Sequence, residues 1–151
     1  MLQTLAPRTG MDALNDAVVG AIPMPPAAAL LGWQAIDIQP GHVRVQYTAR
    51  EEFYNPQGSI QGGFITAMLD DAMGPAAYTL LPEADFAPTL EISVSFLRPA
   101  RAGRLFAEGW IVQQTRRFMR LEGQLTTEDG ELIATAKATA VINRASEGGT
   151  N

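Results

Sequence analysis

One stretch of helical spacing lies among segments that alternate between apolar and polar side chains, and this contrast restricts the fold more than any other feature. Between residues 64 and 78, apolar side chains recur every three or four positions and form one stripe, made of Ile65, Met68, Leu69, Ala72, Met73 and Ala76. Such a stripe covers one face of a sheet. Pro75 lies inside the run and removes a backbone hydrogen bond, so we expect a kink or an early end there.

The segments around this helix are predicted to be strands joined by short turns. They cover residues 33–39, 42–49, 89–97, 104–114, 118–127 and 132–142. Pro40-Gly41 and Asp129-Gly130 are typical hairpin turns, and the strand at 89–97 is expected to point its apolar side chains inward, namely Leu90, Ile92, Val94 and Phe96. The pattern predicts an α+β fold, with five or six mainly antiparallel strands and one long helix.

Shorter features lie outside this sheet and helix. Helical spacing over residues 11–21 follows Asp12, a possible cap, and a proline cluster then ends that helix. A short apolar segment at 27–31 is expected to stop at Gly32. The alanines of the last strand leave room for something bulky, and the central helix is the nearest candidate. We expect one domain over 1–151, with residues 1–26 as an N-terminal extension and 144–151 as a flexible tail.

Composition and charge exclude several classes of function. The chain has 151 residues, 46% of them hydrophobic and 18% charged, which suits a single globular domain. Its net charge of −5 argues against a general binder of nucleic acid or of anionic membranes. With no cysteine and only His42, we expect no metal site and no thiolate nucleophile, and assign His42 a structural role. No apolar run could cross a bilayer, so we expect a cytoplasmic protein.

The start of the long helix carries the residues most suited to chemistry. Gly62-Gly63 opens the run, and the free N–H groups at a helix start stabilise an oxygen that becomes negative. Two carboxylates, Asp70 and Asp71, follow about two turns later, about 100° apart, so periodicity cannot choose between them. An ordinary aspartate has a pKa of roughly 3.9 and is ionised near neutrality, whether it serves as a base, a nucleophile or a solvated surface acid.

These residues occur in a recognisable order along residues 27–143. Asn55, then Gln61-Gly62-Gly63, then Asp70 resemble the motif of the hotdog-fold acyl-CoA thioesterases, in the phenylacetyl-CoA and hydroxybenzoyl-CoA thioesterase branch. Members of that family usually have His at the position of Gln61. The resemblance implies a sheet wrapped around the central helix and hydrolysis of an acyl-CoA thioester to a free acid and CoA, with no cofactor.

The resemblance also implies the roles of the catalytic residues. Gly62 is the oxyanion-hole residue, and Asp70, nine residues after Gln61, is the general base or nucleophile. Asn55 helps to hold the water or the thioester carbonyl, although Asn-Pro also starts turns. Thr89 corresponds to a Ser or Thr that hydrogen-bonds the water in some relatives, and Gln61 can donate a hydrogen bond but cannot exchange a proton near neutral pH.

Other residues are expected to contact the substrate or a second chain. Gly63 and Asp71 lie beside the catalytic pair, and Asp71 is the reserve candidate for its acid. Arginines suit the phosphates of CoA, with Arg98, Arg116 and Arg117 as candidates, although most strand arginines only face solvent. The resemblance implies a homodimer or a dimer of dimers, in which Gly62 of one chain faces Asp70 of the other. A protein that binds an acyl-CoA or acyl carrier without hydrolysis is the second interpretation, and a hydratase is the third.

Overall fold

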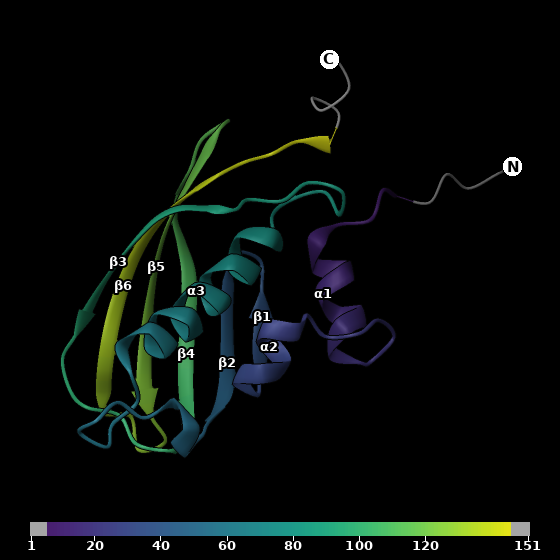
Figure 1. Ribbon diagram of the computed structural model, residues 1–151. Helices are drawn as coiled ribbons and strands as arrows, with labels where there is room; N and C mark the ends of the chain where they lie inside the picture. Colours follow the sequence, from purple (N-terminus) through teal and green to yellow (C-terminus); the bar gives the residue numbers. More distant parts are fainter. Residues whose placement is uncertain (1–5, 146–151) are drawn as a thin grey trace, which may run out of the picture.

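The computed structural model describes residues 6–145, and it has one antiparallel sheet curved around a long helix (Figure 1). The strands are β1 Gln34–Gln39, β2 His42–Ala49, β3 Thr89–Phe96, β4 Gly103–Gln114, β5 Phe118–Thr127 and β6 Leu132–Val141. Their order in the sheet is β1-β2-β4-β5-β6-β3. The helices are α1 Gly10–Val18, α2 Pro26–Leu31, the 3-10 turn η1 Glu51–Phe53 and the central α3 Gly62–Tyr78. The α+β prediction and both hairpin turns are confirmed.

Helix α3 presses its apolar stripe against the sheet, and all six residues expected in the stripe are buried. The closest approach is at two glycines. A Cβ at Gly109 would lie 2.6 Å from the carbonyl oxygen of Ala72, and one at Gly123 would lie 3.1 Å from Cγ of Met73. Gly109 on β4 therefore lets the backbone of the helix lie closer to the sheet than a side chain there would permit, and Gly123 on β5 leaves room for Met73.

A kink or an early end was expected at Pro75, and the early end is wrong, because α3 continues through Pro75 to Tyr78. Proline removes only the hydrogen bond that residue 75 would donate to the carbonyl of Asp71. The next two residues, Ala76 and Ala77, are buried against the sheet. Their packing outweighs the loss of one hydrogen bond one turn before the helix ends.

Strand β3 forms one edge of the sheet, and its apolar side chains are less covered than expected. Leu90 is 65% exposed and Phe96 is 53% exposed, so the prediction that they point into a core is wrong within one chain. Ile92 and Val94, in the middle of the strand, are half-buried. Within residues 6–145, strand β3 pairs with β6 alone, so no further strand of this part of the chain lies beyond it to cover the side chains near its two ends.

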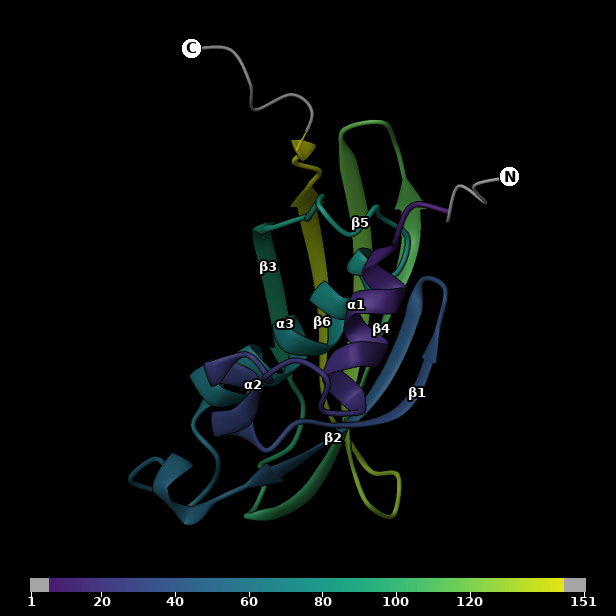
Figure 2. The ribbon, with the colours of Figure 1, turned by 90° about the vertical axis from the view of Figure 1, so that its right-hand side faces the viewer.

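The two short helices lie together on the other side of α3, beside the β1–β2 hairpin (Figures 1 and 2). Helix α1 begins after Thr9, whose side chain accepts a hydrogen bond from the backbone of Asp12. Asp12 is thus the third residue of a capping box, and its assignment as the cap is wrong because Thr9 supplies the capping oxygen. Helix α2 ends at Gly32, as expected, with a φ of 71°.

The C-terminal residues next to β6 contact the loop before β3. Arg144 lies 3.5 Å from the carboxylate of Asp85, and the backbone N–H of Ala145 donates to the same carboxylate. The remainder of the tail expected at 144–151, residues 146–151, lies outside the described residues. Within residues 6–145, no helix is long and apolar enough to pass through a membrane.

Candidate active site

The first turn of α3 has one backbone N–H group that no acceptor uses. The side-chain oxygen of Gln61 accepts from the N–H of Gly63 at 2.7 Å, so Gln61 is the N-cap of the helix. The carbonyl of Gln61 accepts from the N–H groups of Phe64 and Ile65. Among the residues that the structure describes, the N–H of Gly62 has no partner. It lies at the positive end of a long helix and can donate to a ligand oxygen.

A hollow of about 300 Å³ lies in front of this group. It is lined by Asn55, Ser59, Ile60, Gly62, Ile65, Phe96, Leu97, Arg98 and Pro99. The ring of Phe96 passes over the helix start, and a Cβ at residue 62 would lie 3.1 Å from it. A larger residue here would crowd the ring and shield the N–H, so glycine keeps the donor accessible.

Asn55 lines this hollow and also organises its own loop. Its side-chain oxygen accepts from the N–H groups of Gln57 and Ser59, at 3.0 and 3.2 Å. Its amide nitrogen donates to the hydroxyl of Ser59 at 3.1 Å. The turn-forming interpretation of Asn55 is therefore confirmed, and the side chain lies at the wall of the hollow as well.

Two predicted site residues meet on the β3 side of α3. The hydroxyl of Thr89 donates to the carboxylate of Asp70, and their oxygens are 2.6 Å apart. Asp70 is half-buried and Thr89, the first residue of β3, is exposed. The hydrogen bond fixes one oxygen of the carboxylate and leaves the other available to a ligand or water.

Asp71 points to the other side of α3, toward α2 and β2. The hydroxyl of Tyr47 lies 3.0 Å from the carboxylate of Asp71 and 3.0 Å from the carbonyl of Met68. Burial raises the pKa of Asp71, and the charge of Asp70 acts in the same direction, while the Tyr47 hydroxyl opposes them. Burial likewise raises the pKa of Tyr47. The sequence pattern marks Tyr47 only as an inward strand residue, and no signal in it points to Asp71.

The two halves of the predicted chemistry are far apart within one chain. Gly62 and Asp70 belong to the same helix, and eight residues of α-helix span roughly 12 Å along the axis. A thioester carbonyl held by the Gly62 N–H therefore cannot reach the Asp70 carboxylate of the same chain. Any site that uses both groups needs a second copy of the chain.

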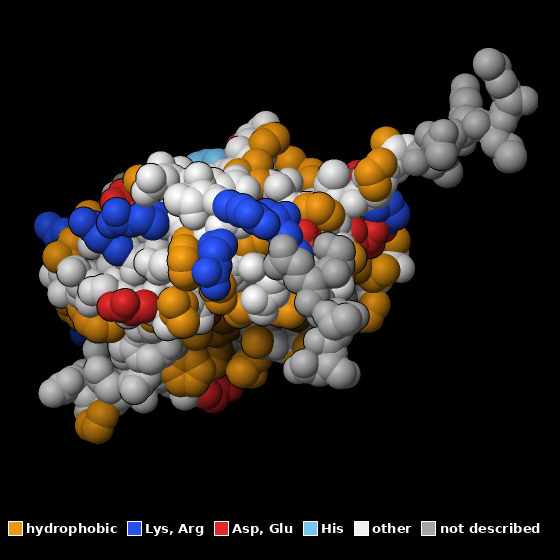
Figure 3. Space-filling view, turned by 90° about the horizontal axis from the view of Figure 1, so that it is seen from above, with side chains coloured by type: hydrophobic (Ala, Val, Ile, Leu, Met, Phe, Trp, Pro, Cys, Tyr) orange, Lys and Arg blue, Asp and Glu red, His pale blue; other side chains and the backbone are white. Residues whose placement is uncertain are grey.

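The three candidate arginines lie at opposite ends of the sheet. Arg98, at the edge of the hollow, pairs with Glu131 at 2.9 Å and donates to the carbonyl of Leu132. Arg116 and Arg117 belong to the β4–β5 hairpin, where they line another hollow with Phe86 and Arg144. Figure 3 looks down on that end of the molecule and shows basic side chains gathered over it. One chain does not bring the three arginines together.

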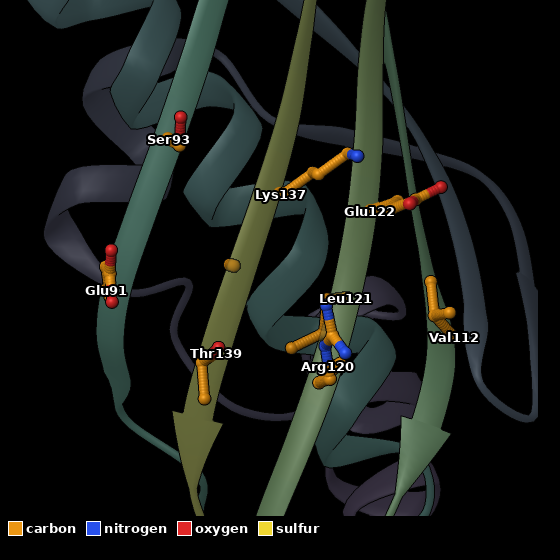
Figure 4. A pocket seen from close by; sticks show the side chains of 9 residues that line it. Glu91, Ser93, Val112, Arg120, Leu121, Glu122, Lys137 and Thr139 are labelled. Atoms are coloured by element: carbon orange, nitrogen blue, oxygen red, sulfur yellow. The ribbon is translucent and has the colours of Figure 1, made fainter.

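A further hollow lies on the face of the sheet opposite α3 and contains none of the predicted catalytic residues (Figure 4). Its walls carry charges of both signs, with Glu91 on β3, Arg120 and Glu122 on β5 and Lys137 on β6. Within residues 6–145, no three His, Asp or Glu side chains are grouped in a way that could hold a metal ion.

Comparison with known protein families finds a match to one of them. A family model described as the thioesterase superfamily matches residues 57–134, which include the start of α3, Asp70 and Thr89. This is slightly more than half of the chain. The matched segment therefore contains most of the candidate site.

Individual proteins agree with the family match. The solved structure of a phenylacetic acid degradation-related protein from Ralstonia eutropha JMP134 has a TM-score of 0.80 and 34% identity, over 84% of this chain and 97% of that one. A "Putative esterase" of Saccharolobus solfataricus is 29% identical over 68% of this chain and 73% of its own length. A Streptococcus mutans protein solved with acetyl-CoA bound has a TM-score of 0.68 at 22% identity, over 74% of this chain and 88% of that one.

Proposed function

We propose, from the premise that the chain belongs to the thioesterase superfamily and has the hotdog fold, that it hydrolyses an acyl-CoA thioester to a free carboxylic acid and CoA. The observation that carries the proposal is the free N–H of Gly62 above a hollow at the positive end of α3. A preorganised donor of this kind stabilises the oxyanion that forms when a thioester is attacked.

Asp70 supplies the second part of the reaction. Its carboxylate, held by Thr89, either removes a proton from a water molecule that attacks the carbonyl or attacks the carbonyl itself. In both cases a C–O bond forms, the C–S bond breaks, and the departing sulfur of CoA takes up a proton. Attack by water gives the free acid directly, whereas attack by the carboxylate gives a mixed anhydride that a water molecule then hydrolyses to the free acid and Asp70. Thiols of this type have a pKa of about 8.5, so the thiolate leaves near neutrality with little help from an acid.

The ease of this departure bears on Gln61, which replaces the usual His. The oxygen of Gln61 caps α3, and its amide nitrogen has no acceptor among the described residues. That nitrogen can donate to the thioester carbonyl beside the N–H of Gly62. Since the leaving thiolate needs no strong acid, a donor that cannot exchange protons is compatible with hydrolysis.

We assign the complete site to two copies of the chain, in a homodimer or a dimer of dimers. Gly62 and Asp70 are separated by roughly 12 Å along α3. A two-fold axis beside the helix would place Gly62 of each chain near Asp70 of the other chain. The exposed apolar side chains of edge strand β3 favour such a contact, because an uncovered apolar edge tends to pair. In such a dimer, the end of the sheet that carries Arg98 in one chain would lie near the end that carries Arg116 in the other chain.

CoA is the proposed carrier of the acyl group. The acetyl-CoA bound to the Streptococcus mutans protein is consistent with this choice. Arg98, Arg116 and Arg117 are the proposed contacts for its phosphates, because guanidinium groups bind phosphate in a forked geometry. Arg116 and Arg117 have no carboxylate partner within the described part of the chain, whereas Arg98 is paired with Glu131.

The test is a thiol-release assay over a panel of short, medium, long and aryl acyl-CoA substrates, with Asp70→Asn compared against Asp71→Asn. We expect Asp70→Asn to lower kcat about a hundredfold or more, and Asp71→Asn to lower it by less than about tenfold. Equal rates in the wild type and in Asp70→Asn would contradict the assignment of the base or nucleophile.

A second candidate function is binding of an acyl-CoA or acyl carrier without turnover. It is favoured by Gln61, because the side chain at that position caps the helix and cannot shuttle a proton. Binding of acyl-CoA with no thiol release by the wild type, together with hydrolysis by Gln61→His, would support this function over the first.

A further inference from the structure

A second cavity lies on the far side of α3 from β3, and its walls are almost wholly apolar. It has a volume of about 310 Å³, opens to solvent, and is lined by α1, the segment 22–25, α2 and the second half of α3. Its apolar lining includes Leu14, Ala17, Ile22, Met24, Trp33 and Pro75. This size and polarity are those of sites that hold small apolar ligands. Among the described residues on its wall, Asp71 alone carries a carboxyl group.

Gly74 forms the rim of the cavity on α3, directly before Pro75, where a residue without a Cβ also avoids a clash with the proline ring. Its φ is not positive, and a Cβ built on it meets no atom within 4 Å. A glycine inside a helix costs about 1 kcal/mol relative to alanine. The space above residue 74 is open to the cavity, and a larger side chain at this position would narrow it.

The rim is close to the proposed reaction centre. Gly74 is four residues after Asp70, so the two lie on the same face of α3 and about 6 Å apart along its axis. An acyl chain whose carbonyl is attacked at Asp70 begins within a few bonds of that carboxylate. It can cross the helix surface where residue 74 has no side chain and enter the cavity beyond.

We propose that the cavity between α1, α2 and α3 holds the acyl group of the substrate, and that Gly74 is the passage by which it enters. This inference rests on the proposed thioester hydrolysis. The substrates it specifies are thioesters of neutral apolar acids with medium-length chains. An acyl group that ends in a carboxylate is disfavoured, because its charge would be buried among apolar side chains and beside Asp71.

Two substitutions narrow the cavity from opposite walls, and a third, outside the cavity, serves as a matched control. Gly74→Val fills the passage from α3, and Ala17→Phe fills the cavity from α1, which lies away from β3. Ala29→Phe makes the same change as Ala17→Phe on an exposed position of α2 outside the cavity. Each protein is assayed for thiol release on straight-chain substrates from butyryl-CoA to dodecanoyl-CoA. Binding of the matching thioether analogues, which cannot be hydrolysed, is measured in parallel.

For the wild type and Ala29→Phe, we expect kcat/KM and affinity to rise about fourfold with each methylene until the cavity is full. Both cavity variants are expected to lose about tenfold or more on octanoyl-CoA and less than about twofold on butyryl-CoA. Unchanged chain-length profiles in both variants would overturn the inference. So would an unchanged profile in Ala17→Phe together with an altered oligomeric state in Gly74→Val, because Gly74 would then make room for a second chain.

The two readouts separate this inference from the proposed function. A wild type that binds the thioether analogues but releases no thiol would refute hydrolysis, and the affinity profile of the variants would still decide the inference. A wild type that binds no analogue of any length would overturn both.

Discussion

The two sides of helix α3 place neighbouring aspartates in opposite environments. On the β3 side, Asp70 is half-buried at an open edge, and its partner is the exposed hydroxyl of Thr89. On the other side, Asp71 is also half-buried, lies on the wall of the cavity between α1, α2 and α3, and is paired with Tyr47, which is wholly buried. The Asp71 side is bordered by the chain's own short helices and is here called the closed side, and the other, the open side, leaves apolar side chains of β3 exposed. The carboxylate suited to react with a ligand is on the side that the chain leaves open.

The largest effect on kcat is expected when the two groups of the proposed site, Gly62 and Asp70, are changed. These variants also test whether a second chain completes the site on the open side. Gly62→Val should crowd Phe96 and shield the free N–H, and we expect it and Asp70→Asn each to lower kcat about a hundredfold to a thousandfold. When the two variants are unfolded together and refolded, random pairing should restore about a quarter of the wild-type activity, because mixed dimers contain one intact site.

Circular dichroism of each refolded variant is the control for misfolding. Folded variants that regain no activity when mixed would contradict a site shared between chains. A fully active wild type that sediments as a monomer would contradict it as well.

On the closed side, removal of the buried hydroxyl should affect stability more than catalysis. Tyr47→Phe leaves the carboxylate of Asp71 and the carbonyl of Met68 without their shared donor, and should lower the free energy of unfolding by about 1–2 kcal/mol. Urea unfolding followed by fluorescence measures this change. A loss of kcat as large as that of Asp70→Asn, with unchanged stability, would contradict the assignment of catalysis to the Asp70 side of the helix.

The hydrogen bond on the open side should have a moderate effect on rate. Thr89→Val removes the donor to Asp70, and we expect kcat to fall about three- to tenfold with no change in the midpoint of unfolding. Thr89→Ser retains the hydroxyl and should keep most of the activity. If serine and valine behave alike, the hydroxyl of residue 89 does not orient the carboxylate.

The smallest expected effect is a dependence of stability on pH that originates on the closed side. Because the pKa of Asp71 is raised above its ordinary 3.8, the folded state binds this proton more tightly than the unfolded chain does. The contribution of Asp71 to stability is therefore fully present below 3.8 and is lost as the pH rises through the folded pKa. Relative to Asp71→Asn, the wild type should become less stable as the pH rises across that window.

Urea titrations of the two proteins at several pH values would show this difference. A gap between them that stays constant with pH, or that changes in the opposite direction, would contradict the burial of an ionisable Asp71. Asp70→Asn provides the comparison from the open side.

Much of the fold is readable from local pattern, because strands and helices impose different periods on buried side chains. The stripe on α3 and the alternation on β2 are confirmed residue by residue. The cap of α1 was misassigned to Asp12, although Thr9 three residues earlier completes a capping-box pattern that could have identified it. The exposure of Leu90 and Phe96 could not be predicted from alternation, because alternation gives the face of a strand and not its position in the sheet.

Some features of the candidate site are likewise set by the sequence, and others only by the tertiary structure. The glycine pair, the capping Gln61 and the spacing to Asp70 are local features of one helix, and a linear sequence contains them in full. The different surroundings of Asp70 and Asp71, and the cavity behind Gly74, arise only when α1, α2 and β3 pack around that helix. Burial and the electrostatics that follow from it depend on contacts between residues distant in the chain, which periodicity within one element does not specify.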